Sequence, residues 1–391
     1  MEEAIELENV KVNRLFIEDR EIDLFEGQYP VPEGVTYNTA VLEGEKTIIV
    51  DTVDHRCCGA WMEQLEAMLS GKKPEYLIIS HMEPDHSGSI SSLCEKYPEI
   101  ELIGNAKTFS MLDQFTADAP IACGRKTVKE GEMLDIGGIR MQFFTAPMVH
   151  WPEVMMTYLP DEKLLFAADA FGRFGDADPQ SPWSEEGRRY YTNIVGKYGT
   201  QVQMALKKAS ALEIQKICPL HGPDLEGELL TQVLEYYKKW STYTPEDEGT
   251  LVAYAGFHGN TKKAAEEMAA VLENAGNSVA LIDLARTNKS YAVAEAFRHK
   301  HLVLAATTYD ASYMPAMEAF LNAIKAKGLQ GRRVGLIENG TWAPMAAKLM
   351  RAQLETMKNM EICEEQVTLR SVMTQKNREE IAMLAHSLLK E

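Results

Sequence analysis

The chain has 391 residues, 45% of them hydrophobic and 25% charged, a composition typical of globular rather than disordered proteins. Lys and Arg total 40 and Asp and Glu total 58, so the formal net charge of −18 argues against extended contact with nucleic acid or anionic lipid. No apolar run approaches the roughly 18 residues of a membrane span, and the acidic start lacks the features of a secretory signal, so we expect a cytoplasmic protein that contacts no membrane.

The first part of the chain mixes strands and helices. Apolar runs at 35–42 and 47–50 flank a polar, Gly-containing turn and predict a hairpin, and helical periodicity follows at 61–69. Further strands are predicted at 76–80, 101–103, 140–145, 164–168 and 214–218. Because several strands lie close together in sequence, this pattern favours an α/β sandwich over a simple wound sheet.

A polar stretch with Pro and Gly at 241–249 predicts a boundary near residue 248, which gives domains 1–248 and 249–391. The second part alternates regularly between strands and helices. The expected strands are 251–255, 278–283, 301–305, 333–337 and 367–372, and the expected helices are 261–275, 292–297, 315–325, 344–357 and 377–389. This alternation is the pattern of a doubly wound parallel sheet.

Metal-capable side chains gather after the strands of the first part. Four of them fall within six residues directly after strand 76–80, and single ones follow strands 140–145, 164–168 and 214–218. Loops at the carboxyl ends of strands can meet at one edge of a fold, so we expect these side chains to converge. The candidate ligands are His81, Glu83, Asp85, His86, His150, Asp169 and His221.

Seven ligands exceed the four of one tetrahedral zinc and suit two metals with a shared carboxylate. Imidazole with carboxylate and without Cys suits iron, manganese or zinc, and carboxylate-rich sites with open positions favour redox iron. His86 is the weakest member of the set, because it and adjacent Asp85 need not both reach the metals.

A second set of candidate residues follows three strands of the second part. After strand 251–255, a short polar loop leads into a helix whose first N–H groups can hold a phosphate, although an ordinary strand–helix turn has the same pattern. Two later loops add polar and aromatic groups that could flank an isoalloxazine ring, with Trp342 as the stacking candidate. The candidate residues are Phe257, His258, Gly259, Asn260, Thr261, Thr308, Tyr309, Asp310, Ala311, Asn339, Gly340, Thr341, Trp342 and Ala343.

The run from His81 to His86, with the three later ligands, resembles the metallo-β-lactamase-like domain of flavodiiron proteins. Hydrolytic members of that superfamily usually carry HxHxDH, and here Glu83 replaces the second His. The three later loops resemble the FMN loops of flavodoxin, in the same domain order. The resemblance implies a metallo-β-lactamase-like αββα sandwich followed by a flavodoxin-like five-stranded parallel sheet.

The same resemblance implies a ligand assignment. His81, Glu83 and His150 would bind one non-haem iron, Asp85, His86 and His221 a second, and Asp169 would bridge them. The residue that matches His86 is not a ligand in some members, so its role stays open.

The activity that this resemblance implies is reduction of O₂ to water, of NO to N₂O, or of both, through FMN. The electrons would come from an external donor, rubredoxin or a reduced deazaflavin, and a head-to-tail homodimer would bring FMN to the irons.

Two other functions remain open: a di-zinc hydrolase with an accessory flavodoxin domain, and a non-catalytic electron carrier or sensor. Glu83 favours the oxidoreductase, because an anionic carboxylate stabilises ferric iron. The flavin loops also depart from the family pattern. Gly256 stands where many members have Ser or Thr, and Thr341 and Pro344 replace common glycines.

Overall fold

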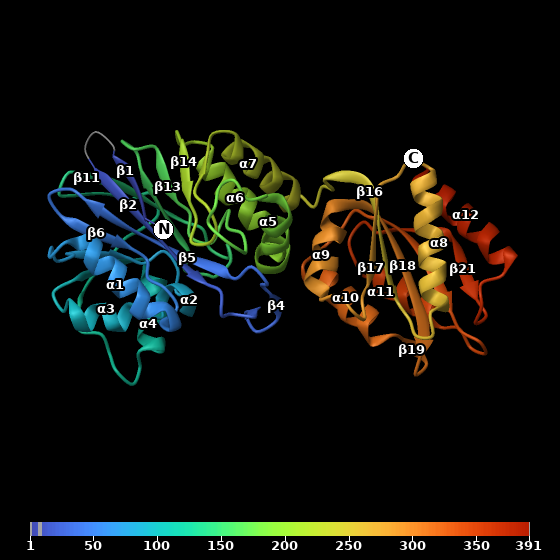
Figure 1. Ribbon diagram of the computed structural model, residues 1–391. Helices are drawn as coiled ribbons and strands as arrows, with labels where there is room; N and C mark the ends of the chain where they lie inside the picture. The colour runs from blue at the N-terminus through green and yellow to red at the C-terminus, as the bar shows by residue number, and fades with distance from the viewer. Residues whose placement is uncertain (1, 7–9, 391) are drawn as a thin grey trace. The chain divides into compact units, whose positions relative to one another are not determined.

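The computed structural model describes residues 2–6 and 10–390, so Met1 at the acidic start, residues 7–9 and Glu391 lie outside the description. The chain forms two compact units (Figure 1). The first comprises Met1–Tyr191 with Thr200–Lys238, and the second comprises Thr192–Gly199 with Lys239–Glu391. Within the described ranges, every helix is too short or too polar to cross a membrane.

The first unit contains two sheets. The first sheet has the order β1-β2-β5-β6-β7-β8-β9, and the second has the order β10-β11-β12-β13-β14-β15. The strands of the first sheet are β1 (Glu2–Glu6), β2 (Lys11–Asp19), β5 (Val35–Glu43), β6 (Thr47–Val50), β7 (Tyr76–Ile78), β8 (Glu101–Gly104) and β9 (Gly124–Thr127). Those of the second are β10 (Met133–Ile136), β11 (Ile139–Thr145), β12 (Met155–Leu159), β13 (Leu164–Phe166), β14 (Lys216–Cys218) and β15 (Leu225–Glu226), and β3 (Leu24–Phe25) pairs separately with β4 (Tyr29–Pro30).

Apolar side chains between these sheets form the core of the first unit. Val12, Leu42 and Ile78 from the first sheet belong to one buried cluster with Phe143 and Phe166 from the second. Figure 1 shows α1, α3 and α4 together on one side of the unit, and α5, α6 and α7 together on another. The αββα sandwich is therefore confirmed, and the antiparallel pairing of β5 with β6 confirms the hairpin.

The helices of this unit are η1 (His55–Cys57), α1 (Cys58–Leu69), α2 (Pro84–Ser87), α3 (Ile90–Lys96), α4 (Ala106–Phe115), α5 (Ser184–Tyr190), α6 (Gly199–Ala209) and α7 (Gly227–Ser241). Most of η2 (Tyr191–Val195), all of η3 (Gly196–Tyr198), the first residue of α6 and the end of α7 are assigned to the second unit.

Strand β2 was not among the predicted strands. Its polar residues, including Asn13 and Arg14, hide the apolar pattern, yet both are buried because β2 lies between β1 and β5. Strand β12 was missed as well, although all of its residues are buried.

The second unit is a parallel sheet in the order β17-β16-β18-β20-β21, with the short β19 paired to β18. Counted along the chain within this unit, the order of the parallel strands is 2-1-3-4-5, the flavodoxin-like arrangement. Helices α9, α10 and α11 pack against one face, and α8 and α12 pack against the other, because successive residues of β16 point alternately into two apolar clusters.

The strands are β16 (Asp247–Ala255), β17 (Val279–Asp283), β18 (His299–Tyr309), β19 (Ser312–Tyr313), β20 (Arg333–Asn339) and β21 (Glu361–Leu369). The helices are α8 (Asn260–Asn274), α9 (Lys289–Arg298), α10 (Pro315–Ala326), α11 (Ala346–Leu354) and α12 (Gln375–Leu389).

The last strand corrects the prediction of 367–372, since β21 begins at Glu361 and ends at Leu369. It lies at the edge of the sheet, where charged residues such as Glu364 and Glu365 stay exposed. These charges conceal the strand from an apolar-run criterion.

A buried ion pair ties the two sheets of the first unit together. Arg14 of β2 bonds to Asp224, between β14 and β15, at 2.9 Å, with side-chain exposures of 1% and 5%. Arg14 also donates to the carbonyls of Thr39 and Pro219, both at 3.1 Å. The guanidinium therefore fixes the loop from Pro219 to Asp224 against the first sheet.

We predict that Arg14→Met lowers the free energy of unfolding of the first unit by about 2–4 kcal/mol, because buried Asp224 loses its guanidinium partner and keeps only the more distant Lys216, at 3.5 Å. Arg20→Met is the matched control, since Arg20 is 71% exposed and pairs with Glu18. The control is expected to change stability by less than about 0.5 kcal/mol. Chemical denaturation of the intact chain measures both, and equal effects of the two variants would contradict the role of the buried pair.

Candidate functional site

The first unit brings all seven predicted ligands to one place. They come from the loops that follow β7, β11, β13 and β14, and the short helix α2 presents Asp85 and His86. Their ligand atoms form two neighbouring groups, in each of which the atoms lie within 4.8 Å of one another. The groups are His81, Glu83, His150 and Asp169, and Asp85, His86 and His221.

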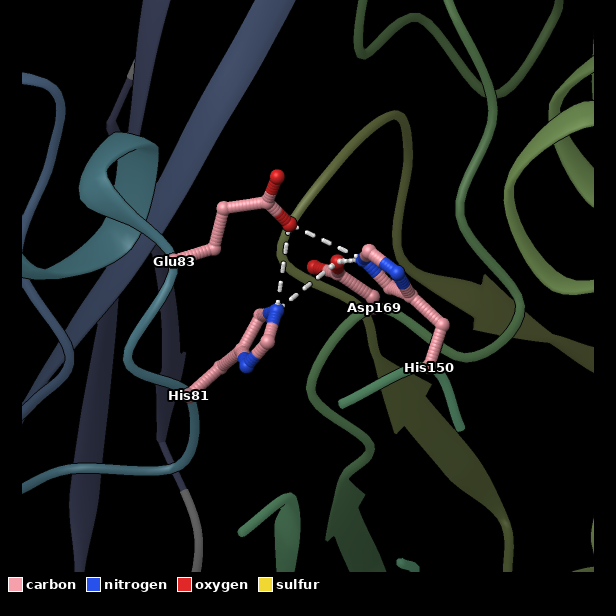
Figure 2. A group of neighbouring side chains, drawn as sticks. All are labelled: His81, Glu83, His150 and Asp169. Atoms are coloured by element: carbon pink, nitrogen blue, oxygen red, sulfur yellow. Dashed lines mark hydrogen bonds and ion pairs between the residues drawn. The ribbon is translucent and has the colours of Figure 1, made fainter. Parts of the chain in front are cut away.

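In the first group, two ring nitrogens face two carboxylates (Figure 2). His150 Nε2 lies 2.9 Å from Glu83 Oε2 and 3.1 Å from Asp169 Oδ2. His81 Nε2 lies 3.3 Å from Glu83 Oε2 and 3.5 Å from Asp169 Oδ2. The four side chains thus surround a single position, toward which two imidazoles and two carboxylates are directed.

The second group lies on the other side of the Asp169 carboxylate. His86 Nε2 is 2.9 Å from Asp169 Oδ1 and 3.1 Å from His221 Nε2, and Asp85 Oδ2 is 3.3 Å from His221 Nε2. Asp169 therefore directs Oδ2 to the first group and Oδ1 to the second.

The chemistry of this donor set fits a pair of cations. The nitrogens of His86 and His221 face each other, an arrangement that needs a proton or a metal ion between them. Neither oxygen of buried Asp85 accepts a hydrogen bond from the described part of the chain. A buried carboxylate that accepts no hydrogen bond is costly unless it pairs with a charged imidazole, as Asp85 can with His221, or coordinates a cation.

The carboxylates and histidines also set one another's charge. Burial opposes the charged form of His150, but Asp169 and Glu83 raise its pKa to about 9. Burial likewise opposes ionisation of Glu83, but hydrogen bonds with His150 and His81 lower its pKa to about 2. The carboxylates therefore stay ionised and attract positive charge into the site.

Outer partners fix the orientation of two of the rings. His81 Nδ1 lies 2.7 Å from Glu153 Oε1, which also accepts the N–H of Met82 at 2.8 Å. His221 Nδ1 donates to the carbonyl of Thr36 at 2.7 Å. In each ring these bonds leave Nε2 directed at the candidate metal position.

Sequence reasoning missed Glu153 and Thr36. The position of Glu153, three residues after His150, was the one available signal.

Tyr190 adds a polar group beside the second candidate group. Its ring centroid is 5.6 Å from that of His221, and its hydroxyl is buried without a hydrogen-bond partner in the described ranges. Burial and the charge of Asp169 raise the pKa of this phenol well above its ordinary value, so it remains protonated.

The second unit has a cavity of about 290 Å³ at the carboxyl ends of its strands, at the position predicted for a flavin. It lies where the strand order changes direction, beside the N-terminus of α8. Trp342 stands at this cavity with 89% of its surface exposed, which is unusual for a large apolar ring. A cavity that combines polar side chains such as Asn260 and Thr308 with such a ring fits a flat, phosphate-bearing cofactor.

The cavity unites most of the predicted flavin residues. Those that line it are Phe257, His258, Asn260, Thr308, Asp310, Ala311, Asn339, Gly340, Thr341, Trp342 and Ala343. Gly259, Thr261 and Tyr309 do not line it, and the hydroxyl of Thr261 is instead 2.7 Å from that of Thr307. Thr307, Met345 and Ser371 line it without having been predicted.

Comparison with known proteins is consistent with both units. Residues 36–222 match the family model described as ODP family beta lactamase. The anaerobic nitric oxide reductase flavorubredoxin of Vibrio vulnificus (strain YJ016) is 30% identical over 350 residues, which cover 86% of this chain and 70% of the relative.

Solved structures agree over nearly the whole chain. Rubredoxin oxygen:oxidoreductase from Desulfovibrio gigas aligns with a TM-score of 0.91 and 24% identity, covering 99% of this chain and 98% of the other. The flavodiiron protein from Giardia intestinalis aligns with a TM-score of 0.90 and 22% identity, covering 97% and 94%. These structural likenesses support the fold, and together with the identity to the flavorubredoxin they establish that the chain belongs to the flavodiiron protein family.

Proposed function

We propose that this protein reduces O₂ to water, NO to N₂O, or both, at two non-haem irons held by the first unit, with FMN in the cavity of the second. The observation that carries the proposal is the division of the Asp169 carboxylate between two groups of ligands. That arrangement suits a bridging ligand, because each oxygen can serve a different metal ion. Residues 1–248 and 249–391 would be the iron and FMN domains.

The proposal assigns His81, Glu83 and His150 to one iron, Asp85, His86 and His221 to the other, and Asp169 to both. The FMN residues are those predicted in the three loops, supplemented by Thr307, Met345 and Ser371. Two irons and one flavin can together supply the four electrons for O₂ or the two electrons for a pair of NO molecules.

The residues of the chain have separate tasks. Glu83 contributes negative charge where a hydrolase of this fold usually has His, which stabilises the higher oxidation state of iron. Glu153 holds the His81 ring, and Tyr190 keeps a proton on a buried hydroxyl beside His221. That hydroxyl can donate a hydrogen bond to a substrate at the second group.

The remaining parts of the proposal concern partners. We infer a cytoplasmic protein that takes electrons from an external donor, rubredoxin or a reduced deazaflavin, and acts as a head-to-tail homodimer. The names of a similar protein, a flavorubredoxin, and of a similar structure, a rubredoxin oxygen:oxidoreductase, support rubredoxin as the first donor to test.

Gas consumption tests the activity directly. We predict that protein loaded with iron and reduced FMN is reoxidised rapidly by O₂ or by NO in anaerobic stopped-flow mixing. The reason is that the two irons and the flavin would together supply the electrons that reduction of the gas requires. Asp169→Asn is expected to lower the rate at least about tenfold through loss of a charged bridging ligand. A di-zinc hydrolase would instead cleave an ester or amide and give no gas-dependent reoxidation beyond that of free FMN.

A second prediction concerns Glu153. Glu153→Gln should lower iron affinity about 10–100-fold, because a neutral amide holds the His81 ring less firmly and makes it a weaker ligand. Competition with a chelator measures the affinity. Glu213→Gln, at a Glu side chain 72% exposed, is the matched control and should leave affinity unchanged. Equal iron affinities in the unmodified protein and in both variants would show that Glu153 does not support the metal site.

A third prediction concerns Gly256, the position at which the family pattern implied by the resemblance has Ser or Thr. A Cβ at Gly256 would lie 2.7 Å from Thr261 Cβ, so Ser does not fit. Gly256→Ser should weaken FMN binding by about tenfold rather than strengthen it, given the usual cost of overpacking. Fluorescence titration measures the affinity. Adding Thr261→Gly removes the Cβ that causes the clash and should restore binding, whereas tighter FMN binding by the single variant would refute the steric argument.

A further inference from the structure

The second unit has another concavity, at the opposite edge of its sheet from the candidate flavin cavity. Its volume is about 780 Å³, and residues at the amino ends of β16, β18, β20 and β21 line it. Because all four strands are parallel, these amino ends lie together and away from the flavin loops. The proposed gas reduction makes no use of this region.

Positive charge predominates among the described residues of the lining. The cations are Lys300, Arg332, Arg333 and Lys390, and the carboxylates are Glu248 and Glu361. Lys300 pairs with Glu248, and Arg333 lies 3.5 Å from Glu361. Two of the four cations are thus paired with a carboxylate of the lining. The lining is therefore more positive than the protein as a whole, whose formal net charge is −18.

Arg332 is the most unusual of these cations. It is only 1% exposed, and its described hydrogen bonds go to the carbonyls of Tyr243, Ala296, Phe297, Gln330 and Gly331 rather than to a carboxylate. Burial without a counter-ion lowers its pKa to about 10. The carbonyl dipoles offset part of this buried charge, and an anion bound in the concavity would offset more of it.

Two nitrogens at this concavity also lack partners. His301 is 6% exposed, and its Nδ1 has no hydrogen-bond partner in the described ranges. The buried Nε of Arg333 also has no hydrogen-bond partner there. These residues are directly paired on neighbouring strands β18 and β20. A bound anion could accept a hydrogen bond from each once His301 carries a proton on Nδ1.

We propose that this concavity is a binding site for a compact polyanion of the phosphate or diphosphate class. Arg333 and His301 would donate to its oxygens, Lys300 would add charge at the rim, and Arg332 would supply the buried potential. Among the described residues of the lining, Leu389 is the one apolar side chain and the largely buried imidazole of His301 is the one aromatic ring, so no Phe, Tyr or Trp is present to stack on a base. This favours recognition of the anionic group itself over recognition of a nucleobase.

Isothermal titration calorimetry tests the proposal on FMN-loaded protein, so that the phosphate position of the flavin cavity is occupied. Inorganic phosphate, pyrophosphate and adenosine diphosphate are titrated in a buffer without other polyanions. We expect one pyrophosphate per chain, bound more tightly than phosphate. Equal binding of adenosine diphosphate would show that the diphosphate group alone is recognised.

Arg333→Gln and Lys300→Gln should each weaken pyrophosphate binding by about tenfold, as expected when a charged hydrogen bond is lost. Arg378→Gln is the matched control, since it removes the same charge from α12, where Arg378 pairs with Glu267. Lys300 is 42% exposed, so its variant keeps the test informative if Arg333→Gln fails to fold. Absence of pyrophosphate binding, or equal weakening by the control, would overturn the proposal.

Discussion

The first unit is organised around one buried carboxylate that needs positive charge on both sides. Asp169 is 1% exposed, and burial alone would make its ionised form costly. The protonated rings of His86 and His81, with hydrogen bonds from His150 and His86, nevertheless hold its pKa well below the ordinary value. The site is therefore an anionic centre enclosed by imidazoles, and a pair of cations is the chemistry that satisfies it most completely.

The fold explains how distant residues reach that carboxylate. The candidate ligands are presented at the ends of strands from both sheets, so the sandwich must keep its two halves in fixed register. Arg14 and Asn38 do so from the first sheet, where they bind the carbonyl of Pro219 at 3.1 and 3.0 Å. Asn38 also donates to the carbonyl of Gly222 at 2.7 Å. The loop that carries His221 is thus held on both sides of the ligand.

In the second unit, two different cavities lie at opposite ends of the parallel strands. The carboxyl ends of its parallel strands carry the polar and aromatic cavity, and the amino ends carry the cationic concavity. The exposed ring of Trp342 belongs to the first, and the buried charge of Arg332 belongs to the second. A ligand at one edge could bind without obstructing the other.

Much of this architecture follows from sequence, since the candidate ligands and the candidate flavin loops come directly after apolar strands that are easy to recognise. The convergence of His81 with His221 was predictable because both follow strands whose ends meet. Features that depend on tertiary contact were not. Arg14 looks like a surface residue until β2 is seen to lie inside the sheet, and Glu153 gains its role only through proximity to His81. Ser371 lines the flavin cavity because it follows β21, and the charged residues of β21 make that strand hard to recognise in the sequence.

Anomalous X-ray diffraction at the iron edge, on crystals of protein purified from iron-replete cells, tests the central claim most directly. The account predicts two iron peaks in each chain, one on either side of the Asp169 carboxylate, with each of the two side-chain groups beside its own peak. A single peak, or signal at the zinc edge alone, would contradict it.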